Sequence, residues 1–206
     1  MKVLLINGSP HDDGCTYTAL REVERVLENE GIETKWHWIG RQPVPGCIAC
    51  GRCKETGQCI FHDAVNELLD ESPSIDGMIV GSPVYYAGPT GQVCAFLDRL
   101  FFAALGRWDG KPAASIVSCR RGGATAAFDR LNKYFSISSM PVISSQYWNQ
   151  VHGSSPADVR QDEEGLQTMR TLGRNFAFVL RAMHQAEEQG LERPDPEPRV
   201  WTNFIR

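Results

Sequence analysis

Four of the chain's seven cysteines lie close together, at Cys47, Cys50, Cys53 and Cys59. Their C-x2-C-x2-C-x5-C spacing places three thiolates on one tight loop, and the fourth can approach from further along the chain. Thiolates spaced in this way can converge on a single cubane, as they do in ferredoxin-type sites. The spacing therefore predicts a [4Fe-4S] site.

Two other interpretations of the four cysteines stay open. Structural zinc sites usually use two separated C-x2-C pairs or add histidines at their own spacing, and His62 is a weak substitute for such a ligand. Free or redox-active thiols would need no metal. Cys94 falls in an apolar helical stretch and is interpreted as a small core residue. Cys15 and Cys119 lie in loops where a backbone role explains them as well as a thiol role does.

A second group of candidate residues lies in the segment 8–18 (GSPHDDGCTYT), between an apolar run and a helical pattern. The segment has neither the lysine of a nucleoside-triphosphate loop nor the G-x-G-x-x-G dinucleotide fingerprint. Ser9, Thr16 and Thr18 offer hydroxyl groups beside the backbone N–H groups of a helix N-terminus, which suits a terminal phosphate. The alternative is an ordinary helix N-cap made by Thr16.

Two further loops add a flat surface and positive charge. The segment 82–91 places Tyr85 and Tyr86 beside a proline and two glycines, so an aromatic wall stands next to backbone that a planar heterocycle can approach closely. The segment 118–123 (SCRRGG) pairs Arg120 and Arg121 with a flexible turn. The alternatives are a packed turn with surface tyrosines and two solvated charges. Together the three loops indicate a ligand with a phosphate at one end and a planar ring at the other.

These loops need a fold that brings them to one place, and the chain alternates strand and helix patterns. Strand patterns occupy residues 2–7, 32–39, 77–81, 113–118 and, more weakly, 141–146. Helical patterns occupy residues 16–30, 63–70, 91–105, 124–135 and 163–184. Such alternation predicts a doubly wound α/β fold, with a five-stranded parallel sheet and helices on both faces. Ligands of such folds bind beyond the carboxyl ends of the strands.

Composition narrows the class of protein. The 206 residues are 42% hydrophobic, which is enough for one domain with its own core. The formal net charge of -4 argues against a nucleic-acid partner. No apolar stretch approaches the roughly 20 residues of a membrane helix, and residues 1–10 lack the basic leader of a signal peptide. We therefore expect a cytoplasmic protein with no membrane or nucleic-acid partner.

Several motifs in these loops occur together in a known family. They are INGSP at 6–10, GSPVYY at 81–86, GQ at 91–92, FLDR at 96–99, SCRRGG at 118–123, QYWN at 146–149, HG at 152–153 and DEEG at 162–165. With these motifs the chain resembles the NADPH-dependent FMN reductase family, whose members have a flavodoxin-like fold. The cysteine spacing resembles that of the iron-sulfur flavoprotein branch, in which such a loop holds a [4Fe-4S] cluster.

The resemblance implies roles for particular residues. It implies contacts to the FMN phosphate from Ser9, Cys15, Thr16 and Tyr17. His11 stands where relatives often have arginine, and a neutral imidazole there can still donate one hydrogen bond. The resemblance also implies an isoalloxazine site lined by Pro83, Val84, Tyr85, Tyr86 and Gly88. The other edge of that ring would be closed by Ser118, Arg120, Arg121, Gly122 and Gly123.

By resemblance, we expect an FMN-dependent oxidoreductase that takes hydride from NAD(P)H and reduces a small acceptor such as a quinone, a flavin, or a nitro or azo aromatic. The flavin carries that chemistry, so no separate catalytic acid or base is required, and His152 is the one candidate that could touch the ring or the substrate. The alternatives are an iron-sulfur flavoprotein or flavodoxin-like carrier that docks on a partner protein, and a redox or metal sensor built on the cysteines. Carriers of that type are usually strongly acidic, whereas this chain is only mildly so.

The expected domain covers residues 1–189, with the cysteine-rich loop 46–60 inserted after the second strand, and residues 190–206 form a proline-rich arm. We also expect a homodimer or homotetramer, because the flavin face between Tyr85 and Arg121 would otherwise be open to water. The apolar stretch 100–108 is one candidate contact, because a large exposed apolar patch usually marks an interface. The arm supplies further candidates, at Val200, Trp201, Phe204 and Ile205.

Overall fold

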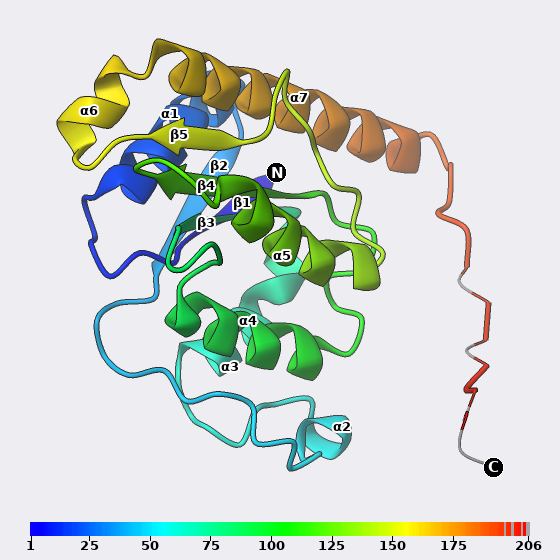
Figure 1. Cartoon of the computed structure of the whole chain (residues 1–206). Helices are drawn as coiled ribbons and strands as arrows, with labels where there is room; N and C mark the ends of the chain where they lie inside the picture. Colours follow the sequence, from blue (N-terminus) through cyan, green and yellow to red (C-terminus); the bar gives the residue numbers. More distant parts are fainter. Residues whose placement is uncertain (196, 199, 203, 205–206) are drawn as a thin grey trace.

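The computed structural model describes residues 1–195, 197–198, 200–202 and 204, so Ile205 lies outside the described residues. Five parallel strands form one sheet in the order β2-β1-β3-β4-β5 (Figure 1). Their bounds are β1 (Lys2–Asn7), β2 (Glu33–Trp38), β3 (Gly77–Pro83), β4 (Ala113–Cys119) and β5 (Gln150–His152). This is the flavodoxin-like strand order, and it confirms the predicted fold class.

Burial explains which strands the sequence marks clearly. Strands β1, β3 and β4 lie inside the sheet and are almost completely buried, so each is a continuous run of apolar or small residues. Strand β2 lies at an edge and mixes charged residues with Trp36 and Trp38. Residues on the two sheet faces belong to two separate hydrophobic cores.

The prediction of a fifth strand at 141–146 is wrong. That segment begins with Pro141, which has no N–H to donate, and its recorded pairing with β4 is a single bridge from Val142 to Ala113. The fifth strand is instead β5, which pairs with the last three residues of β4. Only Val151 in β5 is fully buried, so no hydrophobic run marks the strand in the sequence.

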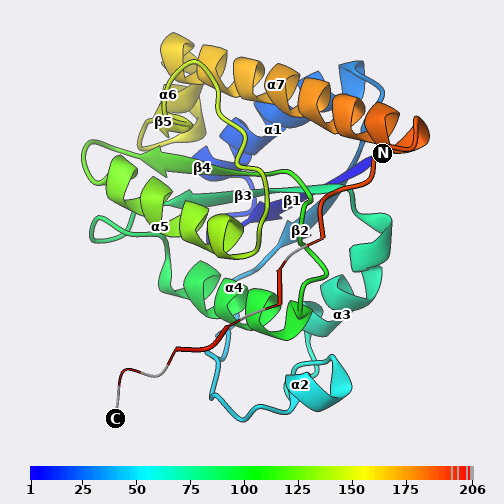
Figure 2. The ribbon, with the colours of Figure 1, turned by 90° about the vertical axis from the view of Figure 1, so that its right-hand side faces the viewer.

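Helices cover both faces of the sheet (Figures 1 and 2). Helices α1 (Cys15–Asn29), α6 (Pro156–Gln161) and α7 (Glu163–Glu188) lie on one face. The other face carries α3 (Ala64–Glu71), α4 (Gly91–Ala104) and α5 (Ala124–Ile137). The five predicted helices are therefore present, and α7 continues past the predicted end at His184. Three short helices were not predicted: α2 (Cys53–Thr56), η1 (Ser72–Ser74) and α6.

Two segments were expected to contact a second copy of the chain: the apolar stretch 100–108 and the C-terminal arm. In the stretch 100–108, Leu100 and Trp108 are buried in the core, whereas Phe102 and Leu105 are exposed. After α7 the described residues form an extended segment with no helix or strand, on which Val200 and Phe204 are exposed (Figure 1). Among the described residues, no helix is long and apolar enough to cross a membrane.

Candidate functional site

The three predicted ligand loops meet at the carboxyl edge of the sheet. The N–H of Gly8 donates to the carbonyl of Gly81 at 2.8 Å, and the Thr90 hydroxyl donates to the carbonyl of Gly8 at 2.9 Å. The hydroxyls of Thr16 and Ser118 share a hydrogen bond of 2.8 Å across 102 positions of the chain. The loops after β1, β3 and β4 are therefore bonded into one surface.

The loop before α1 is held in place by its own side chains. The amide of Asn7 donates to the carbonyls of His11 and Asp12, while its oxygen accepts the N–H of Ser9 at 3.1 Å. The Ser9 hydroxyl in turn accepts the N–H of His11 at 3.1 Å. From the end of β2, the Trp38 indole donates to the Ser9 carbonyl at 2.9 Å. The loop thus keeps its shape through protein contacts alone.

Helix α1 begins in this loop at Cys15, after Gly14, and its first turn contains no acidic residue. Thr16 does not cap the helix, because it lies inside it and its hydroxyl faces Ser118, so the ordinary N-cap interpretation is wrong. Backbone N–H groups at the positive end of the helix are left for an anion, which is the arrangement that a phosphate fits.

The predicted phosphate contacts do not all face the same way. Ser9 and Thr16 are buried at the junction of the loops. Cys15 lies beside β5, with its sulfur 3.7 Å from the Gly153 carbonyl, and burial raises the pKa of its thiol. Tyr17 packs instead against Trp36, with ring centroids 5.1 Å apart, on the side of α1 that faces β2.

The second loop is a tight turn that projects from the end of β3. Tyr85 and Gly88 exchange backbone hydrogen bonds of 2.8 and 3.0 Å, and Tyr86 and Ala87 both have left-handed backbone angles (φ 49° and 58°). Tyr86 is fully exposed and Tyr85 is half exposed. Non-glycine residues in this conformation store strain, which is typical of functional sites.

The third loop packs directly on the second. Gly123 has a φ of 90°, and a Cβ atom there would lie 2.7 Å from the Cα of Ala87. The N–H of Val84 also donates to the Ser118 carbonyl at 3.0 Å. Arg120 and Arg121 are exposed at the rim of this surface. The two loops thus form one aromatic and cationic rim above the first loop.

His152 lies at the end of β5, beside this surface. Its backbone N–H donates to Asp162 at 2.6 Å, and its Nδ1 atom lies 3.8 Å from the same carboxylate. Asp162 also caps α7 by accepting the N–H of Gly165 at 3.0 Å. The DEEG motif therefore begins α7 and holds the end of β5, a role that explains it without a catalytic function.

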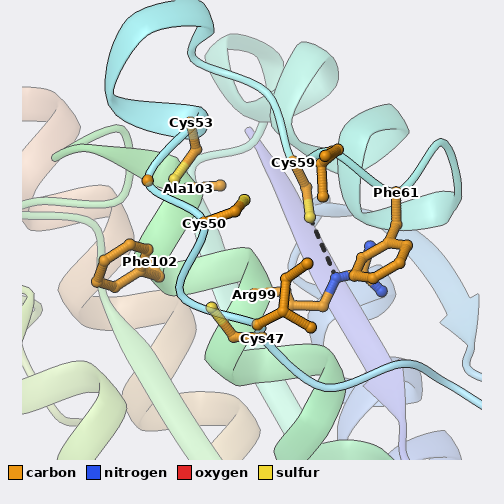
Figure 3. Close-up of a pocket in the computed structure, with 11 residues that line it drawn as sticks. Cys47, Cys50, Cys53, Cys59, Phe61, Arg99, Phe102 and Ala103 are labelled. Atoms are coloured by element: carbon orange, nitrogen blue, oxygen red, sulfur yellow. Dashed lines mark hydrogen bonds between the residues drawn. The ribbon is translucent and has the colours of Figure 1, made fainter.

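The four cysteines of the predicted cluster line a single pocket beside α4 (Figure 3). Cys47 and Cys50 are exposed, Cys59 is partly buried and Cys53 is buried. Burial raises the pKa of the Cys53 thiol, and the nearby thiols raise it further. The other walls are formed by Ile48, Gly51, Ile60, Phe61, Arg99, Phe102 and Ala103. The structure thus brings together side chains that are spread along the chain from position 47 to position 103.

Asn66 on α3 fixes the backbone of the fourth cysteine. Its amide oxygen accepts the N–H of Cys59 at 2.7 Å, and its nitrogen donates to the carbonyls of Cys59 and Phe61 at 3.0 and 3.2 Å. The residue is almost completely buried, so these bonds are shielded from water. Sequence reasoning missed Asn66, although a buried asparagine between apolar helical positions is a signal for such a role.

The chemistry of the donor set bears on what the pocket can hold. Within the described residues, no group of three or more His, Cys, Asp or Glu side chains is placed to hold a single metal ion. Four thiols that line one pocket are the type and number of ligands that a [4Fe-4S] cluster takes, one for each iron.

Comparison with known proteins assigns the family. Residues 1–154 match the family described as NADPH-dependent FMN reductase. The chain belongs to this family. Iron-sulfur flavoprotein MJ1083 from Methanocaldococcus jannaschii is 34% identical over 191 residues, which cover 88% of this chain and 98% of that protein. Iron-sulfur flavoprotein MJ0731 from the same organism is 30% identical over 207 residues, covering 93% and 100%.

The fold also matches solved structures of low sequence identity. A flavodoxin from the domain Archaea superposes with a TM-score of 0.61 at 15% identity, covering 88% of this chain and 99% of the flavodoxin. The family match and the iron-sulfur flavoprotein relatives make this FMN reductase family member a flavin-dependent oxidoreductase that uses FMN. Its place beside the iron-sulfur flavoproteins confirms the resemblance seen in the sequence.

Proposed function

We propose that the protein is an FMN-dependent oxidoreductase that also holds a [4Fe-4S] cluster on Cys47, Cys50, Cys53 and Cys59. The observation that carries the cluster is the single pocket lined by all four cysteines. The named iron-sulfur flavoprotein relatives support it, because they match nearly the whole chain. Such a protein connects hydride transfer, which moves two electrons, to one-electron transfer.

The flavin site would be built by the three bonded loops. The N–H groups at the start of α1 and the Ser9 hydroxyl would hold the phosphate, with Thr16 buttressed by Ser118. Bound FMN supplies hydride and single-electron chemistry. Tyr85 would cover part of the ring, and the Arg120 and Arg121 guanidinium groups would offset the negative charge of reduced flavin. His152, at the end of β5 next to the third loop, would be a contact for substrate.

The cysteine pocket would hold the cluster on its four thiolates. A [4Fe-4S] cluster supplies one-electron chemistry. Phe61 and Phe102 would form apolar walls on two sides of it, while Cys47 and Cys50 stay exposed. The left-handed Gly51 and Gly57 (φ 75° and 69°) let the backbone turn sharply between the ligands, at little steric cost.

NAD(P)H is proposed as the hydride donor, and a quinone, flavin, or nitro or azo aromatic as the small acceptor. The family description supports the nicotinamide donor. The exposed Tyr86 and the adjacent arginines support an open ring face at which a planar donor or acceptor can stack. A carrier that docks on a partner protein would expose the same face, so activity with soluble substrates is the distinguishing measurement.

One anaerobic preparation tests these proposals. We expect extracted flavin to be FMN, with iron and acid-labile sulfide both near four per chain, the content of one [4Fe-4S] cluster. NADH or NADPH should bleach the flavin absorbance and support steady reduction of a quinone or ferricyanide. FAD as the dominant flavin would contradict the phosphate site. Iron and sulfide near zero in protein made with iron supplied would contradict the cluster. Reduction by dithionite but by neither nicotinamide would favour the carrier.

A further inference from the structure

Arg99 is a buried charge at the wall of the cysteine pocket. It lies on α4, and only 1% of its surface is exposed. Removing a charge from water costs several kcal/mol unless the charge is paired and hydrogen-bonded. Its guanidinium donates two hydrogen bonds to Asp63, at 2.7 and 2.8 Å. A third, of 3.4 Å, goes to the Pro45 carbonyl at the start of the cysteine loop.

A fourth donor of Arg99, its Nε–H, points at a candidate ligand. Its Nε atom lies 3.2 Å from the Cys59 sulfur, as Figure 3 shows. The guanidinium also lies over the Phe61 ring, 4.9 Å from its centroid. An arginine guanidinium is always charged in proteins. A permanent cation therefore donates directly to sulfur.

This contact is worth most when the sulfur is charged. A thiol is a weak hydrogen-bond acceptor, whereas a bond between two charged partners is roughly twice as strong as a neutral one. An ion pair with Asp63 alone would need only two of the guanidinium's donors. The Cys59 sulfur satisfies a buried N–H donor of Arg99, and the same bond places a cation directly against the sulfur.

We propose that Arg99 is a positioning residue that sets the reduction potential of the cluster through its hydrogen bond to Cys59, and that Asp63 moderates this effect. The inference rests on the proposed cluster. Hydrogen bonds to sulfur and the local net charge are among the factors that set the potential of iron-sulfur clusters. Reduction adds negative charge, so a neighbouring cation stabilises the reduced form and raises the potential.

The two residues should therefore act with opposite signs. Arg99→Met removes the cation and the N–H donor, so the reduced cluster loses stabilisation. Asp63→Asn removes the carboxylate that offsets Arg99, so the reduced cluster gains stabilisation. Asparagine can still accept the Val65 N–H that Asp63 now caps at 3.1 Å. A purely structural ion pair would weaken the site in both variants and would not produce opposite shifts.

The test is an anaerobic redox titration of the intact FMN-loaded protein, monitored by the EPR signal of the reduced cluster. We expect Arg99→Met to lower the equilibrium constant for one-electron reduction about tenfold, which is about 59 mV, and Asp63→Asn to raise the potential. Arg99→Lys keeps the charge without the planar donor and should fall between the wild type and Arg99→Met. Arg181→Gln, which breaks a remote pair with Glu30, should leave the potential unchanged.

Iron and sulfide content, measured on every variant, separates the possible failures. If Arg99→Met does not retain a cluster, Asp63→Asn alone decides, because Asp63 is 37% exposed and asparagine keeps a side-chain oxygen that can accept from the Arg99 guanidinium. Shifts of the same sign, or no shift in a cluster-loaded Asp63→Asn protein, would overturn the role of Arg99 and leave the proposed function intact. A wild-type protein without iron and sulfide would overturn both.

Discussion

The contact between the second and third loops gives a prediction for FMN affinity. Gly123→Ala would place a methyl group 2.7 Å from the Cα of Ala87 and 3.1 Å from a methyl group of Val84. It would also force a non-glycine residue to a φ of 90°, which costs about 1 kcal/mol. The overlap adds at least about 1 kcal/mol, because the nearest atom is backbone and cannot rotate away.

The third loop relieves that overlap by moving away from the second, and FMN must then restore its position on binding. The free energy of FMN binding to Gly123→Ala is thereby weaker by about 2 kcal/mol, which corresponds to an FMN affinity about 30-fold lower. Quenching of FMN fluorescence on titration with apoprotein measures this directly. Gly46→Ala is the control, because a Cβ there meets no atom of the described residues within 4 Å and the residue lies outside the three flavin loops. Equal FMN affinity in the two variants would refute the proposed loop geometry.

Three further results are expected. Any single cysteine-to-serine change in the pocket should remove iron and the visible absorbance beyond the flavin bands while FMN stays bound. The control, Cys94→Ser, should leave the iron content unchanged. Loss of flavin together with iron would contradict the proposal that the two sites are separable. Burial lowers the pKa of His37, which stacks on Phe96, so the folded state should lose stability as pH falls below about 6.5, and His37→Phe should flatten that dependence in urea unfolding. Light scattering should show a homodimer or homotetramer, because aromatic side chains such as Tyr147 and Trp148 are exposed near the flavin edge, and a monomer at micromolar concentration would count against it.

The inner strands and the long helices could be predicted from the sequence because their burial patterns are continuous. Strands β1, β3 and β4 are buried on both faces, so each is a continuous apolar or small-residue run that can be recognised in the sequence alone. Strand β5 is not, since it has three residues and pairs only with the end of β4. Helix α6 has a local sequence signal that the prediction did not use. Ser155 and Asp158 form a capping box, and Pro156 follows the capping residue.

The candidate sites divide in the same way. The spacing of the four cysteines is local, and the structure places their side chains around one pocket. The residues that orient Cys59 could not be predicted from that spacing, because Arg99 reaches it from 40 positions away on another helix. Arg99 lies inside the FLDR motif, which by itself does not indicate a contact with a cysteine. The sequence does not show which residue Arg99 contacts. That contact depends on how α4 packs against the cysteine loop.

Helix α4 touches both candidate sites. Thr90 caps its start and holds the Gly8 carbonyl of the flavin loops, while Arg99 reaches the cysteine pocket. Nine residues of helix separate these positions, about 14 Å along the axis at 1.5 Å per residue. The helix thus acts as a rigid spacer between the two sites. With FMN and the proposed cluster bound, the length of this one helix would set how far an electron has to travel between the two sites of a chain.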